Sequence, residues 1–159
     1  MRVLPTLSIL VASLVTASAL EAQSPHPIVG AWERFSIKDS TGTNISPPPA
    51  AAFTIFSAEG FYSQTAIPKG RPKLEKPLAD YTKEELLARY TGTEARHGQY
   101  TVSVSRKTLT RTYTSSLNSN AEGGAPQVQN FRIDGDVLIL TSVTPGNKSE
   151  TRFRRAKKQ

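Results

Sequence analysis

From Ala31 to Arg155 the chain repeats one pattern, and this pattern restricts the fold more than any other feature of the sequence. Short segments alternate apolar with polar side chains or are rich in β-branched residues, and turn-forming residues separate them. The expected strands are 31–37, 52–57, 60–66, 98–104, 108–116, 127–133, 136–142 and 150–155. About eight antiparallel strands with hairpin links predict an all-β barrel or sandwich, and a closed barrel is favoured because it leaves no unpaired edge.

One short helix interrupts the strands. Thr82 to Glu85 has the form of a capping box, in which a threonine hydroxyl and a glutamate carboxylate satisfy the free amides of a helix start. Leu86, Leu87 and Tyr90 then form a narrow apolar stripe, and Gly92 can end the helix. Because a helix with one apolar side needs a surface to cover, we expect it to lie across one end or flank of the sheet. The basic, proline-rich stretch 68–77 before it should be an exposed loop.

The first 22 residues have the layout of a secretory signal peptide, with Arg2, an apolar stretch from Val3 to Val15 and small residues near Ala19. The apolar stretch is too short for the roughly 20 residues that a spanning helix needs. The division expected is therefore a signal peptide over 1–22 and one domain over 23–159, in a secreted or periplasmic protein. The chain contains no cysteine, so no disulfide supports the domain.

Several segments resemble, in order, the bacterial lipocalin-like domain family of calycin-like barrels. They are Val29–Trp32, Phe53–Ser63, Gly98–Val102, Phe131–Thr141 and Phe153–Arg155. The resemblance implies that Trp32, preceded by Gly30, packs at the closed end of the barrel. It also implies that an arginine of the last strand, Arg152 or Arg154, lies over the indole.

Strand alternation gives the candidate ligand site. If Trp32 points inward, Arg34 shares its face, and the same rule groups the other candidates. The proposed ligand-binding residues are Arg34, Tyr62, Tyr100, Arg111, Tyr113 and Arg132. Tyrosines with one or two arginines suit a partly apolar molecule with an acidic end. The opposite orientation stays open: the arginines then face water, and a packed core forms from Phe35, Ile37, Phe61, Thr110, Phe131 and Ile133.

The sequence offers little catalytic chemistry. His26 and His97 have no second histidine at metal-ligand spacing, and no cofactor-binding or nucleophile motif appears, so we expect neither metal nor cofactor. We favour a non-catalytic protein that binds a small, partly apolar and possibly acidic ligand inside the barrel.

Two alternatives stay open. The net charge of +7 and the basic C-terminus, from Arg152 to Lys158, permit a surface module that contacts anionic envelope components such as a membrane surface. A nucleic-acid partner is not expected, because Phe153 is the only aromatic residue among those cations. The other alternative is a small hydrolase or isomerase.

Overall fold

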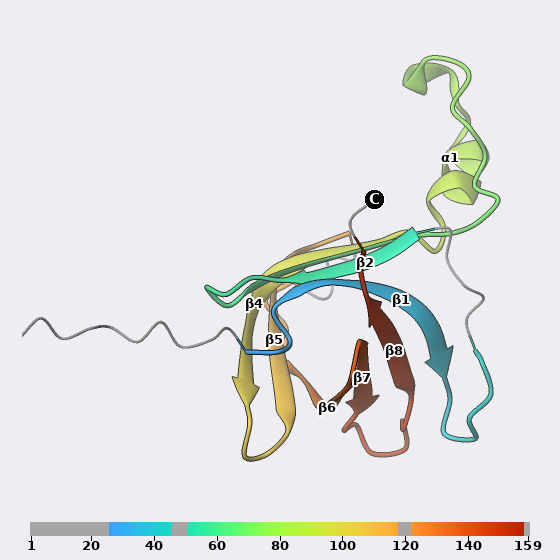
Figure 1. The fold of residues 1–159 in the computed structure, drawn as a ribbon. Helices are drawn as coiled ribbons and strands as arrows, with labels where there is room; N and C mark the ends of the chain where they lie inside the picture. Colours follow the sequence, from blue (N-terminus) through green and yellow to red (C-terminus); the bar gives the residue numbers. More distant parts are fainter. Residues whose placement is uncertain (1–25, 46–50, 118–121, 158–159) are drawn as a thin grey trace, which may run out of the picture.

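Eight antiparallel strands close into a single barrel in which each strand pairs with its neighbours in sequence and β1 pairs with β8 (Figure 1). The computed structural model describes residues 26–45, 51–117 and 122–157. The strands are β1 Gly30–Lys38, β2 Ala51–Phe56, β3 Phe61–Ile67, β4 Glu94–Ser103, β5 Thr108–Ser116, β6 Gln127–Asp134, β7 Val137–Ser142 and β8 Glu150–Arg155. The predicted closed barrel is confirmed. The predicted signal peptide lies outside the described residues.

Period-two alternation decides which side chains enter the barrel. On β2, Ala52, Thr54 and Phe56 are buried while Phe53 and Ile55 are exposed. Trp32 lies near the start of β1, which begins at Gly30; because successive strands run antiparallel, β4 starts at the opposite end of the barrel, at Glu94. We call these two ends of the barrel the Trp32 end and the Glu94 end.

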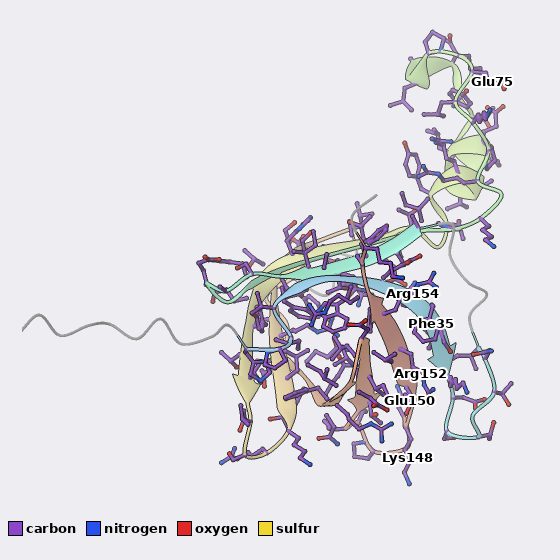
Figure 2. The ribbon with its side chains drawn as sticks, in the orientation of Figure 1. Phe35, Glu75, Lys148, Glu150, Arg152 and Arg154 are labelled. Carbon is purple, nitrogen blue, oxygen red and sulfur yellow. The ribbon has the colours of Figure 1, made fainter. Side chains whose placement is uncertain are left out.

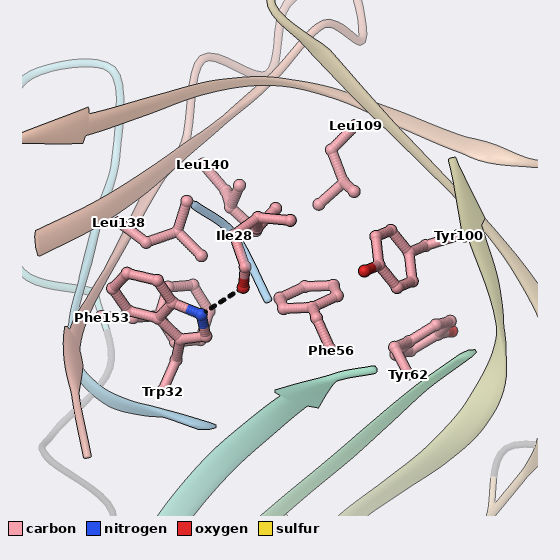
Figure 3. Close-up of a cluster of buried hydrophobic side chains, with 9 residues drawn as sticks. All are labelled: Ile28, Trp32, Phe56, Tyr62, Tyr100, Leu109, Leu138, Leu140 and Phe153. Carbon is pink, nitrogen blue, oxygen red and sulfur yellow. Dashed lines mark hydrogen bonds between the residues drawn. The ribbon is translucent and has the colours of Figure 1, made fainter. Parts of the chain in front are cut away.

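The hydrophobic core fills the Trp32 end (Figure 3). Its buried residues come from the segment before β1 and from seven of the eight strands: Ile28, Trp32, Phe56, Tyr62, Tyr100, Leu109, Leu138, Leu140 and Phe153. The ring of Phe56 meets that of Tyr100 edge to face at 4.9 Å. Rings of this size, interdigitated with leucines, pack this part of the interior with side chains instead of leaving space for a ligand.

Residues 68–93, which we call the excursion, connect β3 to β4 and contain the 3-10 helix η1 (Leu78–Asp80) and helix α1 (Lys83–Tyr90). The predicted capping box is present: Glu85 N donates to Thr82 Oγ1, and Thr82 N donates to Glu85 Oε2. The predicted position is wrong, because α1 buries no residue and projects away from the barrel (Figure 1). Leu87, on the expected apolar stripe, is 64% exposed. No helix among the described residues is long and apolar enough to cross a membrane.

Strand β4 begins four residues earlier than the alternation suggested, so that His97 lies within the strand and not before it. A register shift between His97 and Gly98, opposite β5, accommodates this extension. Gly98 is required there, since a Cβ atom would lie 1.9 Å from the carbonyl oxygen of Thr112. The extension brings Glu94 and Arg96 into the barrel wall beside β3.

Candidate ligand-binding site

Trp32 forms the floor of the barrel interior. Its indole is fully buried, and Nε1 donates a hydrogen bond of 2.7 Å to the carbonyl oxygen of Ile28 (Figure 3). The guanidinium of Arg155 lies 4.2 Å from the centre of the ring system. A last-strand arginine therefore covers the tryptophan, as the resemblance implied, but the residue is Arg155.

The assignment of Arg152 or Arg154 to this position is wrong for a reason of alternation. Phe153 points into the core, so its neighbours on β8 point outward and Arg155 points inward again. Arg154 pairs with Glu33 at 2.9 Å and Arg152 with Glu150 at 2.6 Å, both on the outer surface (Figure 2). Gly30 allows Arg155 to lie over Trp32, because a Cβ atom at residue 30 would lie 2.9 Å from Arg155 Nη1. The φ of Gly30, +127°, also favours glycine at this position.

Toward the Glu94 end the inward side chains become polar. We call the following residues the polar cluster: Arg34, Gln64, Glu94, Arg96, Arg111, Tyr113, Gln127 and Gln129. They come from β1, β3, β4, β5 and β6. The interior is thus divided into a packed apolar half and a polar half that holds both signs of charge.

Arg111 is the centre of the polar cluster and is only 4% exposed. Its Nη1 donates to Gln64 Oε1 at 3.0 Å, and its Nη2 donates to the Oε1 atoms of Gln127, at 2.7 Å, and Gln129. All three acceptors are neutral, so the guanidinium is held in place without being neutralised. Burial lowers the pKa of Arg111 from its ordinary value, which is the expected cost of removing a cation from water. Its Nε is buried and has no partner among the described residues.

A second chain of contacts runs beside Arg111. Glu94 Oε2 accepts from Arg34 Nη1 at 3.2 Å and from Gln64 Nε2 at 3.1 Å. Gln64 therefore links Arg111 to Glu94 through the two ends of its amide. The side chain of Arg34 is 10% exposed and that of Glu94 is 31% exposed. Arg34 Nε, like that of Arg111, is buried without a partner within the described ranges.

Two tyrosines line the polar cluster. The guanidinium of Arg111 lies 5.6 Å from the ring centre of Tyr62, and the rings of Tyr62 and Tyr113 meet edge to face. Burial raises the pKa of Tyr62 to about 12, so its hydroxyl is neutral at ordinary pH. That hydroxyl is buried with no partner in the described part of the chain, whereas the Tyr113 hydroxyl donates to Gln127 Oε1. The site can thus offer a ligand unpaired donors beside aromatic surface.

Four of the six predicted ligand-binding residues lie together here: Arg34, Tyr62, Arg111 and Tyr113. Tyr100 lies in the packed half, where its hydroxyl donates to the carbonyl oxygen of Ser57 at 2.6 Å. Arg132 is exposed on the outer face of β6, so its predicted inward orientation is wrong. The reason is that Phe131 and Ile133 pack against the core and turn Arg132 outward.

The sequence reasoning did not identify Glu94, Arg96, Gln127 and Gln129 as site residues. Glutamine within a strand is usually exposed, and these glutamines become partners of Arg111 only through the β5–β6 register, which pairs Arg111 with Gln127. One signal in the sequence could have identified them: Gln127 and Gln129 are two residues apart, so they lie on the same face of the strand as Phe131. Around the cluster, as elsewhere in the described ranges, no three histidine, cysteine or acidic residues gather to hold a metal ion.

A closed up-and-down barrel of eight strands is the architecture of the lipocalins, which other eight-stranded barrels share, and here it has a tryptophan floor and a polar interior half. Among solved structures, the chain is similar to a lipocalin-like protein from Bacteroides uniformis ATCC 8492, at 13% identity and a TM-score of 0.49. This match covers 81% of the chain and 98% of the other protein.

A DUF4847 family protein from Bacteroides vulgatus ATCC 8482 is similar at 14% identity and a TM-score of 0.45. That match covers 83% of the chain and 96% of the other protein. No protein-family model and no curated protein matches the sequence. The strand pairing of this chain confirms the predicted closed barrel of eight antiparallel strands, the architecture found in lipocalins.

Proposed function

We propose that this protein binds a small, partly apolar molecule with an acidic group in the polar half of its barrel. Eight-stranded barrels of this architecture have room for interior side chains or one small ligand. The acidic group would contact Arg111, and the apolar body would lie along Tyr62 and Tyr113. The signal-peptide layout of residues 1–22 supports the further proposal that the protein is exported and meets its ligand in the periplasm or outside the cell.

The observation that carries the proposal is the state of Arg111. A buried cation is costly unless it is paired, and folded proteins ordinarily place a carboxylate beside it. Here three neutral glutamine oxygens orient the guanidinium and leave its charge uncompensated by a direct partner. Its buried Nε has no partner among the described residues, and neither has the buried hydroxyl of Tyr62, whose ring centre lies 5.6 Å from the guanidinium. An anionic group entering the barrel would satisfy both the charge and the unpaired donors.

Native mass spectrometry of protein purified from the periplasm of a bacterial host tests the proposal. We expect a co-purifying small acid in the wild-type spectrum and its loss in Arg111→Met, which keeps an unbranched, flexible side chain and removes the charge and the hydrogen-bond donors. Charged hydrogen bonds of this kind contribute about 1.5 to 3 kcal/mol, so retention should weaken about tenfold or more.

Arg132→Met is the matched control, since it makes the same charge change on the outer face of β6. Circular dichroism confirms that each variant folds. Equal retention by wild type and Arg111→Met, or equal loss in both variants, would remove Arg111 from the site.

A further inference from the structure

The polar cluster contains more positive than negative charges. Three arginines, Arg34, Arg96 and Arg111, face a single carboxylate, Glu94, among the described residues of the cluster. The guanidinium of Arg96 lies 5.6 Å from the ring centre of Tyr113. Burial is the main cause that lowers the pKa of Arg111, and the positive charge of Arg96 lowers it further. Within the part of the chain that the structure describes, Glu94 is therefore the only carboxylate of the polar cluster that can balance these three cations.

Glu94 is also the member of the cluster best able to leave. Its side chain is three times more exposed than that of Arg34, and it is the first residue of β4, directly after the excursion. A carboxylate that moves into water regains its hydration, whereas Arg34 and Arg111 stay enclosed by the barrel wall. Removing Glu94 from its present position frees Arg34 Nη1 and Gln64 Nε2, next to the unpaired Nε of Arg34.

We propose that Glu94 occupies an anion position beside Arg34 and Gln64 and that the carboxylate of a monoanionic ligand replaces it there. This inference rests on the proposed function, because it assigns the place of the ligand's acidic group within the same site. An incoming carboxylate accepts the hydrogen bonds that Glu94 gives up, from Arg34 and Gln64, and reaches Arg111 through the Gln64 amide or directly. One carboxylate is exchanged for one, so the local charge is unchanged. A dianion would add a charge to the cluster, and a neutral molecule would leave Glu94 in place, so the exchange fits a monoanionic carboxylic acid.

The exchange makes Glu94 a specificity-determining residue that weakens binding of acids without affecting neutral analogues. Glu94→Gln removes the competing charge and keeps an oxygen that can accept from Arg34. We expect its affinity for octanoate to rise about tenfold, because a like charge within a few ångströms of the anion position is removed from a poorly solvated site. The affinity for 1-octanol, which has the same chain and no charge, should stay within about twofold.

Isothermal titration of the purified full chain with octanoate and with 1-octanol measures both affinities. Glu150→Gln is the matched control, since Glu150 is the first residue of β8, at the same end of the barrel, and pairs with Arg152 on the outer surface. It should leave both affinities unchanged. In the double variant Glu94→Gln with Arg34→Met, the gain in octanoate affinity should disappear, because the freed donors are gone.

Each other outcome is decisive. If Glu94→Gln does not raise octanoate affinity while Arg111→Met abolishes it, the exchange is refuted and the proposed function stands. An equal gain in Glu150→Gln, an equal gain for 1-octanol, or a gain that persists without Arg34 also refutes the exchange. If octanoate binds neither to the wild type nor to Glu94→Gln, the proposed function fails and this inference fails with it.

Discussion

Replacing Trp32 by phenylalanine tests whether the floor of the barrel acts as a structural unit. The substitution keeps an aromatic ring and removes the N–H that donates to the carbonyl oxygen of Ile28, a fully buried residue. It also shrinks the ring beneath Arg155. The effect should therefore be a loss of stability with the fold retained.

The magnitude follows from three contributions. Leaving a buried acceptor without its donor costs about 1 to 3 kcal/mol. The void left by the smaller ring costs about 1 kcal/mol, and weakening the cation–π contact costs about 0.5 kcal/mol. Together they predict a decrease in the free energy of unfolding of about 2.5 to 4.5 kcal/mol, a large share of the roughly 5 to 15 kcal/mol of an ordinary domain.

Urea unfolding followed by far-ultraviolet circular dichroism measures this decrease, because Trp32 is the only tryptophan and its fluorescence is lost in the variant. Arg155→Met is the comparison: it removes the cation and two hydrogen bonds, to the carbonyl oxygens of Val29 and Pro27, from a side chain that is 38% exposed. It should cost about 1 to 2 kcal/mol. A Trp32→Phe effect below about 1 kcal/mol, or one no larger than that of Arg155→Met, would refute the reasoning.

Two further predictions concern Tyr62 and Gly98. Because burial raises the pKa of Tyr62 to about 12, tyrosine absorbance at 295 nm should show an ionisation step near pH 12, and Tyr62→Phe should abolish this step. Burial also raises the pKa of Tyr100, so the step near pH 12 is assigned by the Tyr62→Phe variant and not by its lateness alone. Unfolded Tyr62 ionises near pH 10 and folded Tyr62 does not, so stability should fall as the pH rises from 10 toward 12; an unchanged titration curve in Tyr62→Phe contradicts this. Gly98→Ala should cost about 3 kcal/mol or more in thermal unfolding, since the new Cβ overlaps the backbone of Thr112. Gly146→Ala, where the Cβ meets open space at φ +77°, should cost only about 1 kcal/mol, and equal losses would contradict the argument.

The barrel could be predicted from the sequence because its signals are local. Alternation and turn residues identify each strand, and eight strands close by pairing neighbours in the chain. It was harder to predict which side chains of each strand face the barrel interior. On β1 to β5, Trp32, Tyr62, Leu109 and Arg111 share the inward face as predicted, but on β6 the inward face carries Gln129 together with Phe131. An inward face that is polar at one end and apolar at the other has no hydrophobic signal that fixes its direction.

The candidate site was predicted in part for the same reason. Arg111 and Arg34 could be placed by counting along their strands from an apolar neighbour. Glu94 could not, because the start of β4 depends on pairing with β3, where Glu94 lies opposite Ala66. The helix position also depended on information beyond the local pattern: a capping box identifies where α1 begins, but three apolar side chains on eight residues do not determine what the helix contacts.

Because the excursion lies apart from the barrel, its length and sequence can change in evolution without changing the barrel. The β3–β4 ladder pairs Ala66 with Glu94, so the two points where residues 68–93 leave and rejoin the wall are adjacent. Since α1 buries nothing, this segment can be lengthened, exchanged or reduced to a tight turn while the hydrogen-bonding of the eight strands is preserved. Homologous chains can therefore differ greatly in size at this one position and still share the same interior.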